Sequence, residues 1–306
     1  MIELQEVSKS FGDVVALSRL TMSATDGQVT GFLGPNGAGK STTLKLIMGE
    51  IRPDIGDVSV FDEDPFNNAL LKKRIGYVSE HDDLYPWMKG KQFVRSLARL
   101  VLPREQAETA AKEALSKVGL GVKGKRIGAY SKGMKQRLKV AAGIAHHPDL
   151  LILDEPFGGL DPLGRREMKQ LVSELNQQGV TVLISSHILY ELDEMSTRMV
   201  LIHRGQALAE GPPTEILNLI DQFPHQILFQ APPTELHTLS KLLIEEDIVK
   251  SITFNKEKER EDLVVITETP TTFYPVATRI IAENGLLIKH LESQTDNIEA
   301  IFDYLT

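Results

Sequence analysis

Short apolar runs alternate with segments of helical periodicity over the first two thirds of the chain. In Ser131–His146, apolar residues such as Met134 and Leu138 fall on one helical face, and the opposite face carries Lys135, Gln136, Arg137 and Lys139. The predicted strands are Gln28–Leu33, Ile75–Val78, Leu150–Leu153 and Val180–Ser185, and the other predicted helices are Gly39–Met48 and Pro162 to about Gln178. Apolar strands that alternate with helices predict an α/β layered fold with a largely parallel core sheet.

The last 82 or so residues follow a different pattern. The predicted elements are strands at His225–Gln230, Val249–Asn255, Leu263–Thr267 and Leu286–Leu291, helices at Thr234–Ile244 and Phe273–Glu283, and a last helix from near Asp296. The order βαββαβ is typical of a ferredoxin-like α+β domain. Residues 225–306 hold 14 acidic and 7 basic side chains, and Pro212, Pro213 and Pro224 stand nearby. We therefore expect two domains, 1–222 and 225–306.

The composition restricts the possible functions. Apolar residues make up 42% and charged residues 25% of the chain, the balance of a soluble globular protein, and the absence of cysteine excludes disulfides and thiolate sites. A net charge of −8 argues against a nucleic-acid partner, because neutralising phosphates requires surplus Lys and Arg. No apolar stretch approaches the roughly 20 residues that span a bilayer. The first residues lack the basic start and apolar run of a signal peptide.

A glycine-rich loop follows the first predicted strand. The stretch from Gly34 to Ser41, GPNGAGKS, fits the phosphate-loop pattern G-x-x-x-x-G-K-[ST] without a mismatch. Glycines let successive backbone N–H groups point at phosphate oxygens, and a helix that begins near Gly39 adds its positive N-terminal end. We expect Lys40 to reach the β- and γ-phosphates and Ser41 to ligate Mg²⁺. The predicted nucleotide-binding residues are Gly34, Pro35, Asn36, Gly37, Ala38, Gly39, Lys40, Ser41 and Thr42.

Two adjacent carboxylates, Asp154 and Glu155, follow the apolar run Leu150–Leu153. Their side chains point in different directions, so Asp154 is suited to hold Mg²⁺ and Glu155 to polarise an attacking water. His187 follows another predicted strand. Because ligands of doubly wound sheets collect at the carboxyl ends of the strands, His187 is placed to hydrogen-bond a γ-phosphate or a water.

Taken together, the motifs resemble the ATP-binding cassette of ABC transporters over residues 1 to about 222. The ordered set is the phosphate loop, IGYVSE, YSKGMKQR, LLILDEP, GGLD and SSH. The resemblance implies a P-loop NTPase cassette that binds ATP and Mg²⁺. It also implies head-to-tail pairing of two cassettes, with each ATP between the phosphate loop of one and the signature motif of the other.

The resemblance assigns further positions by motif. Phe11 matches the aromatic that stacks on adenine, Glu80 the Q-loop residue that touches the metal, and His187 the switch histidine. Ser131 and Gly133 belong to the signature motif, and Asp161 to the D-loop. A serine where a helix begins is also suited to cap free N–H groups, which is compatible with the signature role.

Two motifs depart from the usual family pattern. The signature is Tyr130-Ser-Lys-Gly-Met134 in place of LSGGQ, and Glu80 stands where glutamine is usual. Both departures, the stretch Leu84-Tyr-Pro86 and the C-terminal segment Ile298–Thr306 resemble the ATP-binding subunits of ABC-2-type transporters. Since the phosphate loop, both carboxylates and His187 remain, we expect ATPase activity.

The resemblance implies an ATPase that powers a separate integral-membrane permease, and it favours export as the direction of transport. It implies a cytoplasmic location, peripheral on the inner face of the membrane through the permease, and a second cassette that is an identical chain or a close paralogue. One alternative is an ABC-type ATPase acting on nucleic acid or ribosomes, but such chains usually join two cassettes or carry long coiled coils or zinc cysteines. Another is a regulatory ATP-binding module without turnover, against which Glu155 and His187 count.

Overall fold

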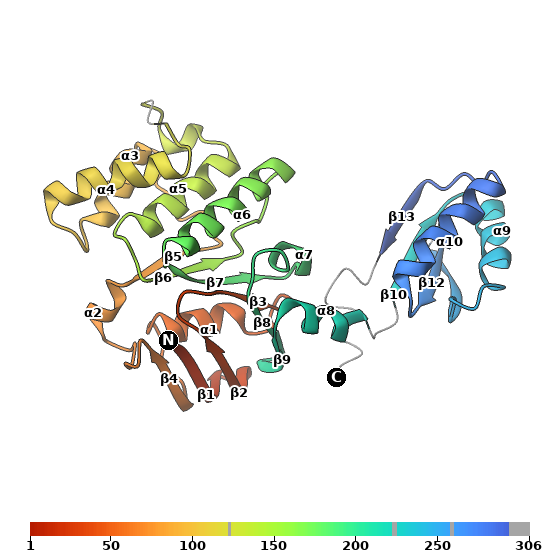
Figure 1. The fold of residues 1–306 in the computed structure, drawn as a ribbon, viewed down its shortest axis with the longest axis horizontal. Coiled ribbons are helices and arrows are strands. Elements are labelled where there is room, and N and C mark those ends of the chain that lie inside the picture. Colours follow the sequence, from red (N-terminus) through yellow and green to blue (C-terminus); the bar gives the residue numbers. More distant parts are fainter. Residues whose placement is uncertain (122–123, 222–224, 258–259, 294–306) are drawn as a thin grey trace. The chain divides into compact units, whose positions relative to one another are not determined.

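A computed structural model describes residues 1–121, 124–221, 225–257 and 260–293 (Figure 1). The chain divides into two compact units, Met1–Pro213 and Thr214–Thr306. Among the described residues, no helix combines the length and the apolar character needed to cross a membrane.

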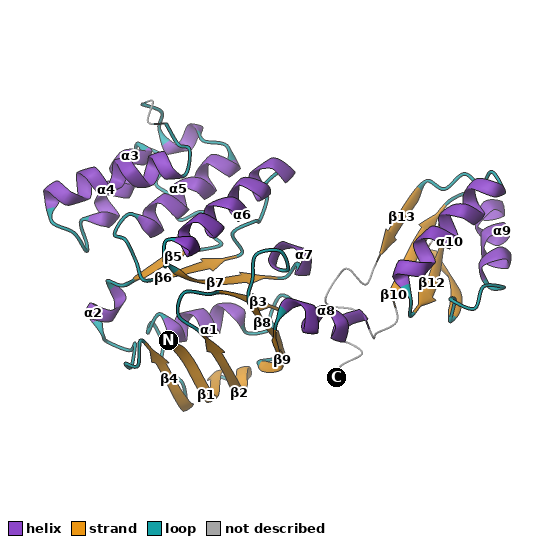
Figure 2. Ribbon diagram, viewed as in Figure 1, coloured by secondary structure: helices purple, strands orange, loops and turns teal. Residues whose placement is uncertain are grey.

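A six-stranded sheet in the order β5-β6-β7-β3-β8-β9 forms the centre of the first unit (Figure 2). Its strands are β3 (Val29–Leu33), β5 (Ile75–Val78), β6 (Leu150–Asp154), β7 (Thr181–Ser186), β8 (Arg198–His203) and β9 (Gln206–Gly211). All neighbours pair in parallel except β8 and β9. The predicted α/β fold with a largely parallel sheet is confirmed. Because β3, β6 and β7 are buried along their whole length, they show continuous apolar runs rather than alternation.

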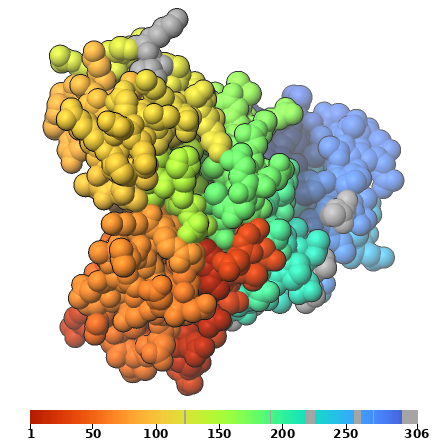
Figure 3. All heavy atoms as spheres, turned by 60° about the vertical axis from the view of Figure 1, so that its left-hand side comes forward, coloured from red at the N-terminus to blue at the C-terminus, as the bar shows by residue number. Residues whose placement is uncertain are grey.

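Helices fill the connections between these strands. They are α1 (Lys40–Ile47), α2 (Ala69–Lys72), α3 (Gly90–Ala98), α4 (Arg104–Lys117), α5 (Lys132–Ile144), α6 (Pro162–Gln177) and α7 (Leu189–Leu192), with a 3₁₀ turn at Ile127–Ala129. Helices α3, α4 and α5 pack against one another, and α5 also lies on β5. In the space-filling view, α3 and α4 (yellow) form one end of this unit and the red to orange N-terminal segments form the other (Figure 3).

The exposed face predicted for α5 is wrong at two positions. Gln136 and Lys139 are 6% and 7% exposed, although both stand among charged residues. The loop that follows β5 lies over this side of the helix, since the Lys139 Nζ donates to three of its carbonyls. Periodicity alone places polar residues on the water side and does not detect a covering loop.

An antiparallel sheet, β2-β1-β4, is absent from the predicted elements. Its strands are β1 (Ile2–Phe11), β2 (Val14–Ala24) and β4 (Ile55–Val60). The β1–β2 register shifts three times, and Glu6 and Arg19 have positive φ angles of 50° and 53° at these irregularities. The shifts break the alternation that identifies a half-buried strand. Ile2 and Leu20 from this sheet share a buried core with Phe32 of β3.

The second unit contains a four-stranded antiparallel sheet in the order β11-β12-β10-β13. Its elements are α8 (Pro213–Asp221), β10 (His225–Gln230), α9 (Pro233–Leu243), β11 (Ser251–Glu257), β12 (Arg260–Thr267), α10 (Pro270–Glu283) and β13 (His290–Ser293). Its core packs Ile227 and Phe229 of the sheet against Leu236 of α9 and Phe273 of α10.

The strand predicted at Leu286–Leu291 is wrong over residues 286–289, because β13 begins only at His290. Leu286 and Ile288 pack against the core of this unit without joining the strand ladder, so their apolar pattern reflects burial alone. The helix predicted from near Asp296 lies outside the described residues.

We predict that a chain ending at residue 222 folds and unfolds cooperatively on heating, because the buried residues described for the core of this unit, from Ile2 to Ile202, all precede that point. A chain ending at Ser196 is the control. It lacks β8, whose buried Met199 and Val200 pair with β3, and should not fold. Thermal unfolding followed by circular dichroism measures both. An unfolded 1–222 chain would mean that the second unit belongs to the main core.

Candidate active site

The loops at the carboxyl ends of the parallel strands enclose a cavity of about 220 Å³. Phosphate-loop residues, the start of β2 and three carboxylates line it: Val14, Val15, Ala16, Pro35, Asn36, Gly37, Gly39, Lys40, Ser41, Thr42, Glu80, Asp154 and Glu155. Parallel pairing aligns these strand ends, with Leu33 opposite Ser186 and Asp154 opposite Ser185. The predicted phosphate loop and both predicted carboxylates therefore meet at one edge of the sheet.

The phosphate loop depends on glycine at two positions. A Cβ on Gly34 would lie 2.4 Å from the carbonyl oxygen of Ile202, and Gly39 has a φ of 108°, which side chains with a Cβ rarely adopt. Gly39 immediately precedes α1, which starts at Lys40. The first backbone N–H groups of the helix consequently face the edge of the cavity, where helix N-termini bind anions.

Lys40 is buried and satisfied by the protein itself. Its Nζ donates to the carbonyl oxygens of Gly34 at 2.6 Å and Pro35 at 3.2 Å, and lies 3.1 Å from the Oε1 of Glu155. Both side chains of this ion pair are under one tenth exposed. A buried ammonium requires such partners, because its desolvation is costly. The cation is thus held beside the cavity by two carbonyls and a carboxylate.

Glu155 joins Lys40 to His187. The Nδ1 of His187 lies 2.9 Å from the Oε2 of Glu155, while Oε1 faces Lys40. Glu155 also has a positive φ of 47°, a conformation that costs a non-glycine residue on the order of 1 kcal/mol. Its backbone N–H donates to the hydroxyl and the carbonyl of Ser185, which hold it there. The strained backbone aims the carboxylate at the lysine and the histidine.

Asp154 is buried beside this pair. The Ser185 hydroxyl donates to its Oδ1 at 2.5 Å, and the Tyr77 hydroxyl lies 3.5 Å from its Oδ2. Burial raises the pKa of Asp154 above its usual value, and the hydrogen bond from Ser185 opposes that shift. Burial also raises the pKa of Tyr77, and the neighbouring Asp154 adds to this effect. The carboxylate is therefore poorly compensated by the protein alone, which favours an arriving cation.

The donors around the cavity fit a hard divalent cation. The Ser41 hydroxyl and the carboxylates of Glu80 and Asp154 all line it, and Mg²⁺ prefers such oxygen ligands. In the described part of the chain, no group of three or more His, Cys, Asp or Glu side chains is arranged to hold a metal. These residues would therefore hold Mg²⁺ only together with further oxygens, such as those of phosphate and water.

The predicted signature and D-loop residues do not line this cavity. The Ser131 hydroxyl accepts from the backbone N–H of Met134 at 3.3 Å and caps α5, and the Asp161 Oδ1 accepts from Gly164 at 2.8 Å and caps α6. Phe11 is half exposed and pairs with Val14, which does line the cavity.

Sequence reasoning missed a polar network behind His187. The Ser186 hydroxyl donates to the buried Glu191 at 2.7 Å, and Glu191 pairs with Arg165 at 3.4 Å. Arg165 also donates to the carbonyl of Leu160 in the D-loop. Burial raises the pKa of Glu191, and the hydrogen bond from Ser186 opposes that shift. The sequence signal for this network was the pair of serines before His187, because buried hydroxyls at the end of a strand need hydrogen-bond partners.

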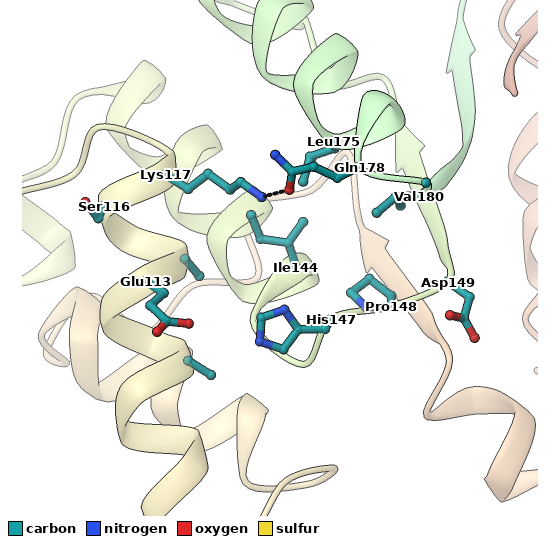
Figure 4. Close-up of a pocket in the computed structure, with 13 residues that line it drawn as sticks. Glu113, Ser116, Lys117, Ile144, His147, Pro148, Asp149, Leu175, Gln178 and Val180 are labelled. Atoms are coloured by element: carbon teal, nitrogen blue, oxygen red, sulfur yellow. Dashed lines mark hydrogen bonds between the residues drawn. The ribbon is translucent and has the colours of Figure 1, made fainter. Parts of the chain in front are cut away.

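A larger cavity of about 640 Å³ lies elsewhere in the first unit (Figure 4). Ile144, Pro148 and Leu175 line it, and the Lys117 ammonium donates to Gln178 across it. Its residues Asp149 and Val180 directly precede β6 and β7, so it lies at the amino ends of the strands. Ligands of such sheets bind at the carboxyl ends, and this cavity contains none of the predicted site residues.

Comparison with known proteins shows what this chain is similar to. The family described as ABC transporter matches residues 17–158. A bacitracin transport ATP-binding protein of Bacillus licheniformis is 36% identical over 215 residues, 69% of this chain and 70% of that protein. Its Enterococcus faecalis counterpart is 29% identical over 317 residues, 100% of this chain and 96% of that protein. The chain is also similar to a solved structure, a dimeric ATP-binding cassette in a post-hydrolysis state bound to ADP and Pi. The match has a TM-score of 0.64 at 24% sequence identity and covers 70% of this chain and 99% of that one, which shows that the two share a fold.

We predict that Asp154→Asn stabilises the protein without nucleotide and metal. Because folding raises the pKa of Asp154, its stabilising contribution is present below the unfolded pKa and is lost as the pH rises through the folded pKa, so the ionised form costs stability at neutral pH. The amide removes that charge and still accepts from Ser185. The melting temperature at pH 7.5 should rise by about 2–4 °C, the shift that ~1 kcal/mol gives in a domain of this size.

The matched control is Asp161→Asn, since asparagine caps a helix as well as aspartate does and should leave the melting temperature unchanged. A lower melting temperature for Asp154→Asn would show that the carboxylate stabilises the empty site.

Proposed function

The chain belongs to the ATP-binding proteins of ABC transporters and is an ATPase subunit of such a system, and we propose that it powers export through a permease on a separate chain. The B. licheniformis and E. faecalis relatives are both named for bacitracin transport, which makes bacitracin the first cargo to test. The cargo would contact the permease rather than this subunit. Attachment to the permease would hold the subunit at the inner face of the membrane.

One observation carries the proposed mechanism: Glu155 contacts both Lys40 and His187 at the edge of the phosphate-loop cavity. In the proposed reaction, Lys40 leaves Glu155 and the two carbonyls for the β- and γ-phosphates. Glu155 is then free to orient the attacking water and accept its proton, while His187 hydrogen-bonds the γ-phosphate. Ser41, Glu80 and Asp154 would hold Mg²⁺, which supplies charge neutralisation for the phosphates when bound.

A second cassette would complete each site. Ser131, Gly133 and Asp161 do not line their own cavity, and Ser131 stands at the N-terminus of α5. A helix N-terminus is an anion site, so this end of α5 suits the γ-phosphate held by a partner cassette. The partner would be an identical chain or a close paralogue. Phe11 would stack on adenine at the cavity entrance.

For the second unit we propose a ferredoxin-like domain used for dimer contact or regulation. Its βαββαβ order, antiparallel pairing and strand order β11-β12-β10-β13 support that fold type. The E. faecalis relative matches the chain over its whole length, so it has a counterpart of this unit. The alternative is a lobe that only buries surface.

Glu155→Gln should retain ATP binding and lose at least about 100-fold in ATPase rate, because an amide cannot act as a base. Binding should be no weaker than in the wild type, since the amide also releases Lys40 from its ion pair. The variant should form an ATP-dependent dimer, visible by size-exclusion chromatography with light scattering.

Lys40→Ala is the contrasting variant, and it should lose ATP affinity itself because it removes the cation paired with phosphate. Near-normal turnover of Glu155→Gln would refute its role as base. Unchanged ATP affinity of Lys40→Ala would count against the phosphate-loop assignment.

Glu80→Gln should make the ATPase rate less steeply dependent on Mg²⁺. Without the metal, the Glu80 carboxylate would repel the γ-phosphate and an amide would not, so the wild type should lose more activity as Mg²⁺ is depleted. We expect half-saturating Mg²⁺ to change by about threefold or more, equivalent to ~0.7 kcal/mol. Rates titrated with Mg²⁺ at fixed ATP measure this. Superimposable curves for the two proteins would mean that the Glu80 carboxylate has no special part in the Mg²⁺ dependence of the ATPase.

A further inference from the structure

Helix α5, which begins at the signature motif, lies directly on the strand that leads to Glu80. A Cβ on Gly76 of β5 would lie 2.2 Å from the carbonyl oxygen of Gly143 in α5. No side chain separates the two backbones at this point. Strand β5 ends at Val78, and the loop that carries Glu80 follows immediately. The helix and the base of the loop therefore form one rigid contact.

Lys139 of α5 reaches from this contact into the loop. Its Nζ donates to three successive carbonyl oxygens, those of Ser79 at 2.9 Å, Glu80 at 3.1 Å and His81 at 3.2 Å. An ammonium has three donors, so this set uses all of them. Burial lowers the pKa of Lys139, and the nearby Asp82 opposes that shift. Burying a lysine ammonium costs free energy unless acceptors such as these three carbonyls replace its water.

A second lysine on the same face supports the loop from outside. Lys135, one turn before Lys139, pairs with the Oδ2 of Asp82 at 2.9 Å, and the Oδ1 of Asp82 lies 3.9 Å from the Lys139 Nζ. Ser79 closes the loop internally by donating to the carbonyl of His81 at 3.0 Å. The path of residues 79–82 is thus fixed by cations from α5.

We propose that Lys139 is a positioning residue that sets the loop 79–82, and with it the Glu80 carboxylate, relative to the phosphate loop. The proposal rests on the proposed function in one respect, the contact of Glu80 with Mg²⁺. Lys139 does not line the cavity and acts through the loop backbone. Because Ser131 begins the same helix, a movement of α5 at its signature end is transmitted to Glu80 through Lys139.

Loop order can be measured without nucleotide, metal or turnover. The chain has no cysteine, so His81→Cys gives a single site for a nitroxide spin label on an exposed side chain, and its backbone carbonyl still accepts from Lys139. The label should give a restricted electron paramagnetic resonance spectrum when Lys139 is present. Lys139→Met should add a mobile component, and Lys139→Arg should restore much of the restriction.

Lys169→Met is the matched control, because it removes a helix lysine that pairs with Glu194 at 2.8 Å away from the loop. It should leave the spectrum unchanged. An equally restricted spectrum in Lys139→Met, with the protein folded by circular dichroism, would overturn the proposal.

Kinetics then separate positioning from general stabilisation. Lys139→Met should lower kcat and shift half-saturating Mg²⁺ by about threefold or more, while the KM for ATP at excess Mg²⁺ changes by less than about twofold. In a Glu80→Gln background the same substitution should add no further Mg²⁺ shift, because the carboxylate that it positions is gone.

Additive Mg²⁺ shifts in the double variant would overturn the route through Glu80. If Lys139→Met mobilises the label but Glu80→Gln leaves the Mg²⁺ curve unchanged, then Lys139 positions the loop and the proposed role of Glu80 is the part that fails.

Discussion

The parallel pairing of β3, β6 and β7 is the constraint on which the site depends. It ends the three strands at one edge, so that the phosphate loop, the two carboxylates and His187 arrive together from segments far apart in sequence. Complete burial fixes these strands against slippage, because no residue along them can turn to water. The two carboxylates and His187 are therefore placed by the ends of buried strands, and the phosphate loop begins from another such end.

At that edge, the charged side chains differ in how well the protein compensates them. Lys40 is paired with two carbonyls and Glu155, whereas the hydrogen bonds described for Asp154 come from the hydroxyls of Ser185 and Tyr77. In the proposed mechanism, nucleotide binding exchanges the partners of Lys40, and a bound cation would compensate the charge of Asp154. Glu155 keeps its positive φ because its backbone N–H is hydrogen-bonded to Ser185, and such bonds hold a strained backbone in place.

Much of this was predictable because its signals are local. The phosphate loop, the carboxylate pair and the buried strands each occupy a few consecutive residues with a fixed pattern. The β2-β1-β4 sheet was not predicted because register shifts break the alternation of apolar and polar residues in its strands. Leu286 was wrongly placed in a strand because a residue that is buried without strand pairing shows the same apolar pattern as a strand residue. Lys139 stands among charged residues and is typical of a solvated helix face. Its burial depends on a loop some 60 residues earlier in the chain, which no local pattern contains.

The contact between Gly76 and Gly143 also limits which substitutions this chain can accept. The obstacle to a side chain at position 76 is a main-chain carbonyl, which no substitution elsewhere can shrink. At Gly34 the obstacle is likewise a backbone oxygen, whereas at Gly37 the space is open and only the backbone angle restricts the choice. Mutational drift can therefore sample asparagine or aspartate at Gly37 at modest cost. At Gly76 a side chain would require the backbone of α5 to move away from β5, so any substitution there would disturb the packing of the helix on the sheet.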